Sequence, residues 1–313
     1  MLYYIIPALI FGWSLGTNSA ANVFGPPVAS KMIKYQYAVL LSAVFIVLGA
    51  FLQGQNGIET IRRFSSNSLL ISSISVLSAA FTLMIMTYLK VPVSSSQAII
   101  GSIIGINLIT NQSVEWTALI KVVSAWVATP LGGAFFGFIS YKLFAIFIRK
   151  IKSIVLRGRI LKLLTIIFGC YGAYALGANN VANITGVFAD DIGITNATLI
   201  GGIAIASGVL TFSKRIMLSV GKDIAALDYF TSTIVVFSQS ITVWIFALIG
   251  VPVSISQAVL GAIIGSSLAA GNAEINRKQV TKMIVAWVNT PVSAGFLAIA
   301  MVFCLRLMGF SIQ

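Results

Sequence analysis

Long apolar stretches separated by short polar segments follow one another along the whole chain. Five lie in the first half, at residues 2–15, 36–52, 69–89, 93–110 and 117–148, and five lie in the second, at residues 160–176, 194–212, 231–250, 253–271 and 280–308. Most of them approach the roughly 20 residues that a helix needs to cross a bilayer. The pattern predicts an all-α integral membrane protein with about 10–12 transmembrane or re-entrant helices.

The last stretch of each half is too long for one upright span. We expect it to be either strongly tilted or broken, with the breaks at Thr129–Pro130 and Thr290–Pro291, because proline removes a backbone donor from a helix. The first stretch has neither the cationic start nor the small-residue cleavage pattern of a signal peptide, so we interpret it as a retained span.

The two halves repeat one another. Residues 91–105 and 251–265 are identical at 11 of 15 positions, at an offset of 160. Two further pairs of polar segments match at an offset of 161, namely 16–22 with 177–183 and 121–130 with 282–291. Three paired blocks in one order indicate an internal duplication. We therefore divide the chain into a first membrane repeat, residues 1–155, and a second, residues 156–313.

The number of spans in each repeat decides their relative orientation. With five spans, an odd number, the second repeat enters the membrane from the opposite face. We therefore predict two inverted-topology repeats related by a pseudo-two-fold axis in the membrane plane.

Composition agrees with a membrane protein, since hydrophobic residues make up 58% and charged residues 9%, against roughly 25% charged residues in soluble domains. The net charge of +13 is scattered over loop edges, which argues against a nucleic-acid partner. By the positive-inside rule, the basic linker near residues 149–162 is cytoplasmic and contacts anionic lipid headgroups in a multi-pass cell-membrane protein. This linker contains Arg149, Lys150, Lys152, Arg157, Arg159 and Lys162.

One repeated polar segment reads Val-Pro-Val-Ser-x-Ser-Gln. Proline disfavours helix in the residue before it, and serine is a good helix N-cap, so this segment predicts a discontinuous helix that restarts inside apolar sequence. A helix N-terminus has unpaired N–H groups and about half a positive charge, which bind anions. The alternative is a structural kink filled by neighbouring side chains. The candidate anion ligands are Ser94, Ser95, Ser96, Gln97, Ser254, Ser256 and Gln257.

The other repeated segments supply neutral oxygen atoms. Asparagines four residues apart share a helix face, and carboxamides can bind a cation or an oxyanion. The glycine before each pair lets the backbone leave the helix and expose carbonyl groups, which are good Na⁺ ligands. Hydrogen bonding between helices is the alternative role. The candidate sodium ligands are Thr17, Asn18, Asn22, Ala178, Asn179, Asn183, Thr129 and Thr290, and Asn22 and Asn183 are also candidates for the anion.

These three paired segments resemble the inorganic phosphate transporter (PiT) family over essentially the whole chain. The family signature is Gly-Ala-Asn-Asp-x-Ala-Asn in each half, with a Pro-Val-Ser-Thr-Thr-His-like segment downstream. The resemblance implies a phosphate site at the interface of inverted repeats and cation-coupled uptake. Two positions depart from it, because the aspartate is replaced by Ser19 and Asn180 and the histidine by Gln97 and Gln257. No role of that acid or that imidazole carries over.

These departures bear on the coupling ion. A proton relay inside a membrane needs titratable groups, and the chain has no histidine and no acidic residue within the repeated segments. We therefore expect a secondary active transporter that imports inorganic phosphate by Na⁺ symport and alternating access. The anion is held at the broken-helix N-termini near the bilayer midplane, and bound Na⁺ compensates its charge.

Several alternatives stay open at this stage. An H⁺-coupled phosphate permease or a sulfate permease of the same family would use similar ligands, and duplicated broken helices could also form an anion channel. A membrane enzyme is disfavoured, because the spans contain no nucleophile with a base and no acidic pair. We expect phosphate, Na⁺ and the lipid bilayer as partners and no cofactor apart from the transported ions. The sequence leaves the oligomeric state open, a homodimer included.

Overall fold

The computed structural model describes residues 2–64, 68–89, 93–223, 227–271 and 275–310, and within these ranges the chain is helical, without strands. The first repeat contains α1 (Leu2–Asn18), α2 (Ala21–Ala29), α3 (Tyr35–Gln53), α4 (Gln55–Arg62), α5 (Leu69–Tyr88), α6 (Ser95–Ile109) and α7 (Trp116–Arg149). The second contains α8 (Ile154–Thr185), the short 3-10 helix Gly186–Phe188, α9 (Ala189–Ile192), α10 (Ile194–Phe212), α11 (Lys214–Asp223), α12 (Tyr229–Ile249), α13 (Ile255–Ala270) and α14 (Arg277–Leu307).

The helices have the lengths and apolar surfaces of a membrane protein. Among the described residues, seven helical segments are long and apolar enough to cross a bilayer, and they contain α3, α5, α7, α8, α10, α12 and α14. By contrast, α6 and α13 have 15 and 16 residues. At about 1.5 Å per residue they are shorter than a hydrocarbon core of roughly 30 Å. The prediction of an all-α membrane fold with discontinuous helices is confirmed.

The prolines of α7 and α14 do not break these helices. α7 runs for 34 residues through Pro130, and α14 runs for 31 residues through Pro291. The preceding threonines, Thr129 and Thr290, donate their hydroxyls to carbonyls of their own helix at 2.6 Å. The predicted breaks are therefore wrong. At about 1.5 Å per residue both helices exceed the thickness of the hydrocarbon core, so they must tilt or extend beyond it.

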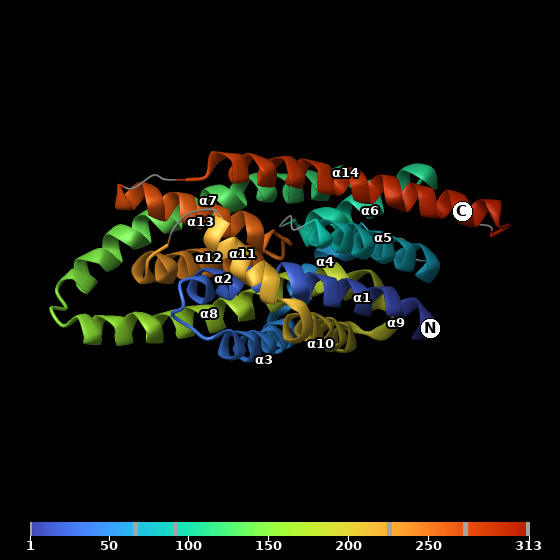
Figure 1. Ribbon diagram of the computed structural model, residues 1–313. Helices are drawn as coiled ribbons and strands as arrows, with labels where there is room; N and C mark the ends of the chain where they lie inside the picture. Colours follow the sequence, from blue (N-terminus) through green and yellow to red (C-terminus); the bar gives the residue numbers. More distant parts are fainter. Residues whose placement is uncertain (1, 65–67, 90–92, 224–226, 272–274, 311–313) are drawn as a thin grey trace.

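The duplication read from the sequence reappears in the order of the helices (Figure 1). α3, α4, α5, α6 and α7 correspond to α10, α11, α12, α13 and α14. α1 and α2 together correspond to α8, the short 3-10 helix and α9, since α2 matches residues 182–190 at the offset of 161. The repeats therefore differ in where this first element breaks, because α1 ends at Asn18 whereas α8 continues past the equivalent Asn179 to Thr185.

The first helix of the chain runs parallel to a helix of the other repeat. Gly12 of α1 lies against Ala204 of α10, and Gly16 lies against Gly208. Because the residue numbers rise together in both helices, α1 and α10 point in the same direction.

The first helix of the second repeat points the other way. The Thr185 hydroxyl of α8 donates to the Ala197 carbonyl of α10 at 2.7 Å, and Val181 lies against Gly201. Here the numbers run in opposite senses, so α8 is antiparallel to α10 and therefore to α1. Since α1 and α8 open the two repeats, the repeats are inverted, as predicted.

The short helix of each repeat packs against the other repeat. α6 of the first repeat packs along α14 of the second, and α13 of the second packs along α7 of the first (Figure 1). The contacts are backbone to backbone. Gly101 meets Pro291, and Gly261 meets Pro130 at the equivalent position. Small residues allow membrane helices to approach this closely, so each repeat completes its packing only against the other.

Adding a methyl group at either of these glycines should destabilise the protein. A Cβ atom at Gly101 or Gly261 would come far closer than van der Waals contact to the backbone of Pro291 or Pro130. Overpacking of this kind costs about 1–3 kcal/mol. We expect Gly101→Ala and Gly261→Ala to lower the unfolding temperature of the detergent-solubilised protein, measured by intrinsic fluorescence. Gly158→Ala, where nothing lies within 4 Å of the added atom, is the matched control, and equal melting of all three variants would contradict the packing argument.

Candidate functional site

Both short helices begin at buried serines. Ser94 caps α6 and accepts a hydrogen bond from the backbone N–H of Gln97 at 3.3 Å, while its hydroxyl lies 3.0 Å from that of Ser96. In the second repeat the hydroxyls of Ser254 and Ser256 lie 2.8 Å apart at the start of α13. All five side chains are buried. The predicted helix restarts are therefore present in both repeats.

The two helix starts lie next to one another across the repeat interface. The Ser256 hydroxyl of the second repeat donates to the Val93 carbonyl of the first at 3.5 Å. Val91 and Pro92 of the first repeated segment lie outside the described residues. Two helix N-termini with unpaired N–H groups and partial positive charge thus occupy one buried region.

Asn179 of α8 holds the extended segment that leads into α13. Its Nδ2 donates to the Val251 carbonyl at 2.9 Å, and its Oδ1 accepts from the Val253 N–H at 2.9 Å. The backbone of this segment is not part of a helix, so the Asn179 carboxamide supplies both a donor and an acceptor to it. Asn179 is therefore largely occupied by the protein itself.

The neighbouring asparagines of α8 connect this segment to the first repeat. Asn180 Oδ1 accepts hydrogen bonds from the Ser95 hydroxyl of α6 at 3.2 Å and from Asn183 Nδ2 at 3.1 Å. Asn180 is not among the ligands predicted from the sequence. The available signal was its position, since it occupies the place of the aspartate in the signature that the segment resembles.

The first repeat differs, because its helix α1 ends at the position that corresponds to Asn179 of α8. α1 ends at Asn18, and the N–H groups of Ser19 and Ala20 both bond to the Leu15 carbonyl, at 2.8 and 3.3 Å. Within the described ranges, no backbone hydrogen bond reaches the carbonyls of residues 16–18. The predicted departure from helix thus occurs here and exposes oxygen atoms.

In the second repeat this part of the prediction is wrong. α8 continues through Gly177 and Ala178 to Thr185, so the Ala178 carbonyl lies within a helix. Gly177 instead permits close packing, since it lies against the Ile46 carbonyl of α3. Gly16 has a similar role against Ile205 of α10.

Unpartnered carboxamide oxygens gather in the repeated segments. Of the seven buried carboxamide oxygens that lack a hydrogen-bond partner among the described residues, five belong to these segments. An unpartnered buried polar atom costs about 1–3 kcal/mol, and such atoms are rare in folded proteins. Their concentration indicates a site for a ligand or water. The atoms are Asn18 Oδ1, Asn22 Oδ1, Gln97 Oε1, Asn183 Oδ1 and Gln257 Oε1, and Asn22 Nδ2 is also unpartnered.

Charge is absent from this cluster. Its segments, residues 17–22, 94–97, 179–183 and 254–257, contain no ionisable side chain. The described residues also contain no group of three His, Cys, Asp or Glu side chains that could hold a metal ion. These four segments can therefore bind ions only through neutral oxygens, N–H groups and helix dipoles.

The three predicted threonines lie on three different helices, α1, α7 and α14. Thr17 borders a cavity of about 540 Å³ that also contacts Thr87, whose hydroxyl accepts from Asn18 Nδ2 at 2.8 Å. Thr129 and Thr290 are buried in α7 and α14. No hydrogen bond between described residues joins either of them to the asparagine and serine cluster.

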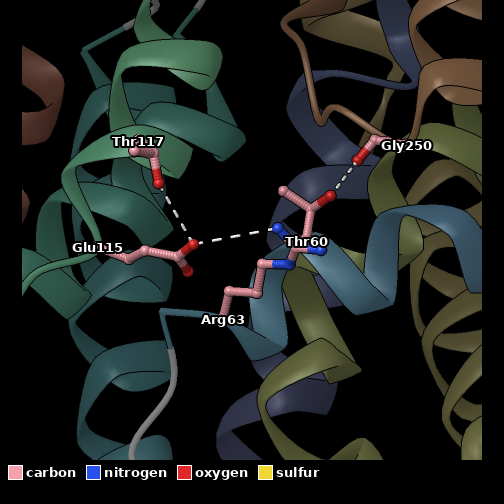
Figure 2. Close-up of polar contacts among 5 residues, drawn as sticks. All are labelled: Thr60, Arg63, Glu115, Thr117 and Gly250. Atoms are coloured by element: carbon pink, nitrogen blue, oxygen red, sulfur yellow. Dashed lines mark hydrogen bonds and ion pairs between the residues drawn. The ribbon is translucent and has the colours of Figure 1, made fainter.

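A polar cavity of about 430 Å³ adjoins the segment held by Asn179. In Figure 2 the Thr60 hydroxyl of α4 donates to the Gly250 carbonyl at 2.6 Å. The Arg63 guanidinium lies 4.0 Å from the Glu115 carboxylate, which also accepts from Thr117 at 3.4 Å. An ion pair thus joins α4 to the start of α7 beside this cavity.

The two cavities share two equivalent walls, the end of α5 or α12 and the helix α11 or α4, and they differ in a third, which is α1 in one and the start of α7 in the other. The larger one is lined by Thr87 and Tyr88 at the end of α5, and the smaller one by Leu248 and Ile249 at the end of α12. Inverted repeats, short helices with buried starts and a polar site between them define the class of secondary transporters.

Comparisons with known proteins identify the family. A model of the phosphate transporter family matches residues 15–298, and the chain belongs to this family. Its members are transporters rather than enzymes, so the expectation that the protein is not an enzyme is confirmed. A Pyrococcus horikoshii protein named "putative phosphate permease" is 28% identical over 94% of this chain and 96% of its own length. The sulfate permease CysP of Bacillus subtilis is 29% identical over 92% and 83%.

A solved structure shares the fold. The structure entitled "The sodium-dependent phosphate transporter" superposes with a TM-score of 0.85 and covers 98% of both chains at 22% sequence identity. This likeness supports the two-repeat membrane architecture described above.

Removing the Asn179 side chain should weaken the fold. Asn179→Ala leaves the Val251 carbonyl and the Val253 N–H without their partner, and each buried orphan costs about 1–3 kcal/mol. We expect a clear drop in the unfolding temperature in detergent. Asn196→Ala is the control, since this exposed side chain bonds, among the described residues, only to the Ile192 carbonyl of α9. If both variants melted at the same temperature, the structural role of Asn179 would be refuted.

Proposed function

We propose that this protein is a secondary active transporter that imports inorganic phosphate together with Na⁺ by alternating access. One observation carries the proposal, namely the five unpartnered carboxamide oxygens in a buried cluster that has no ionisable side chain. Oxygen atoms of this kind bind a hard cation and carry no proton at ordinary pH.

The anion would bind where the two short helices begin. The starts of α6 and α13 direct N–H groups and hydroxyls into one region, and helix N-termini favour negative charge. Asn22 Nδ2 adds an unpartnered donor, and Asn183 lies beside the same region through Asn180. The proposed phosphate ligands are Ser94, Ser95, Ser96, Gln97, Ser254, Ser256, Gln257, Asn22 and Asn183.

The cation would bind mainly in the first repeat. The carbonyls of residues 16–18 accept no backbone hydrogen bond within the described ranges, and Asn18 and Asn22 each have an unpartnered oxygen. In the second repeat Asn179 is occupied by Val251 and Val253, and among the asparagines of residues 179–183 only Asn183 has an unpartnered oxygen. The proposal therefore places more weight on Asn18 and Asn22 than on Asn179, Ala178, Thr129 and Thr290.

Charge compensation couples the two substrates. Hydrogen phosphate brings one to two negative charges, and an uncompensated ion in a medium of low dielectric constant costs several kcal/mol. The segments that form the cluster contain no Lys or Arg side chain to offset this charge. Bound Na⁺ would offset it, so that phosphate binds well only when Na⁺ is present and the loaded site can change its access.

The two cavities suggest the access routes. Because the repeats are inverted, the equivalent ends of α5 and α12, which line one cavity each, lie toward opposite faces of the membrane. One adjoins Thr17 and the end of α5, and the other adjoins Gly250 and the end of α12. In alternating access, each would connect the buried site to one side in turn.

Sulfate is a second candidate, favoured by the likeness to a sulfate permease. The two anions differ in one chemical respect, since hydrogen phosphate carries an O–H donor that sulfate lacks. Unpartnered acceptors such as Gln97 Oε1 and Gln257 Oε1 suit the phosphate O–H group. A site that receives this proton rejects the anion without it more strongly than a site made only of donors does.

The first test is uptake of radiolabelled phosphate into liposomes that contain the purified protein. With an inward Na⁺ gradient we expect accumulation. Replacing Na⁺ by K⁺ at constant pH should weaken phosphate binding at least about tenfold, or about 1.4 kcal/mol. Uptake driven by a proton gradient alone would refute Na⁺ coupling. Complete inhibition by sulfate at a concentration equal to that of phosphate would favour the second candidate.

The second test separates ligand groups from structural groups. Asn22 has no side-chain partner among the described residues, so Asn22→Ala should leave the unfolding temperature unchanged or raise it. The same change should raise the Na⁺ concentration that activates uptake by about tenfold or more. Gln97→Ala and Gln257→Ala should weaken phosphate uptake in the same way. Normal uptake by all three variants would assign these side chains to structure alone.

A further inference from the structure

A cavity of about 660 Å³ lies where the two repeats are joined. The last turns of α7 and the first turns of α8 form two of its walls, and the start of α12 forms a third. A short turn links α7 to α8 at one end of the molecule (Figure 1). This cavity shares no lining residue with the segments of the ion site.

Basic groups stand on two sides of this cavity. Arg149 at the end of α7 and Arg157 near the start of α8 both line it and are exposed. The facing wall contains Asp228, whose Oδ1 accepts from the Thr231 N–H at 2.7 Å and caps α12. Two positive charges and one negative charge leave the lining with a net charge of +1, which matches one phosphodiester group.

Apart from Ser30 and the hydroxyls of Tyr141 and Tyr229, the remainder of the lining is apolar. Ala145 and Leu161 are buried in its wall, and the rings of Tyr141 and Phe230 meet edge to face at 5.0 Å between centroids. Ile154, in the first turn of α8, is 77% exposed beside Arg157. Exposed apolar side chains next to arginines are typical of an element that sits between the headgroups and the acyl chains.

We propose that this cavity binds the headgroup of an anionic phospholipid. The phosphodiester lies between Arg149 and Arg157, the Asp228 carboxylate accepts from a headgroup hydroxyl, and the acyl chains follow the exposed apolar faces of α7 and α8. Basic pockets between membrane helices bind anionic headgroups in this manner, and arginine forms bidentate contacts with phosphate oxygens. The inference does not depend on the proposed transport function.

Gly158 provides a way to test the cavity without changing its charge. It lines the cavity, and a side chain built on it would meet nothing within 4 Å of its Cβ atom. Gly158→Trp should therefore fold normally and fill the space that the headgroup needs. Arg149→Gln combined with Arg157→Gln removes the charge and leaves the space.

The experiment measures binding of fluorescently labelled phosphatidylglycerol to the purified full-length protein in neutral detergent, followed by anisotropy. We expect the double arginine variant and Gly158→Trp each to bind at least about tenfold more weakly than the wild type. Arg159→Gln, which removes a charge from the same linker but does not line the cavity, should bind normally. Unfolding temperatures without lipid establish that each variant is folded.

Competition identifies the source of the phosphate group. Unlabelled phosphatidylglycerol should displace the probe, whereas phosphatidylcholine and inorganic phosphate at equal concentration should not. Displacement by inorganic phosphate would show a free-phosphate site and overturn the lipid assignment. Wild-type binding by both the double arginine variant and Gly158→Trp, or equal weakening by Arg159→Gln, would also overturn it.

Discussion

A backbone group inside a bilayer must find its partner within the protein, and this constraint explains most of the structure. A helix that starts in the membrane exposes N–H groups that lipid cannot satisfy. α6 and α13 start in this way, so polar side chains must surround their first turns. Ser94 caps α6, and Asn179 completes the backbone of the segment before α13. The broken helices by themselves therefore require polar side chains at this place, independently of any ligand that the cluster binds.

The same constraint makes the two repeats depend on one another. Because the short helices cannot bury themselves, each packs along the long last helix of the opposite repeat. The close approach requires glycine at the contacts, as at Gly101 and Gly261. The Ser95–Asn180 and Ser256–Val93 hydrogen bonds then cross the interface at its polar centre. This mutual packing fixes the proposed ion site between the repeats.

The sequence predicted much of this architecture for physical reasons. The apolar stretches, the duplication and the helix restarts follow from hydrophobicity and from proline and serine chemistry, and the structure confirms them. The breaks at Pro130 and Pro291 were wrong, because a proline inside a long membrane helix removes one hydrogen bond without ending the helix. The role of Asn180 was missed because hydrogen bonds such as Asn180–Ser95 join residues far apart in the sequence.

The similar asparagine segments of the two repeats use their polar atoms in different ways. Both contain asparagines four residues apart after a glycine, yet α1 ends at Asn18 while α8 continues past Asn179. In α8, hydrogen bonds link the asparagines to one another, to the segment before α13 and to the first residue of α6, so most of their polar atoms are used in folding. In the first repeat Asn18 and Asn22 retain free oxygens beside free carbonyls, at a cost in stability. Unpartnered groups that destabilise the empty protein become useful when a ligand satisfies them. The first repeat is therefore better suited to hold the proposed cation, and the second is better suited to hold in place the helix starts that are proposed to bind the anion.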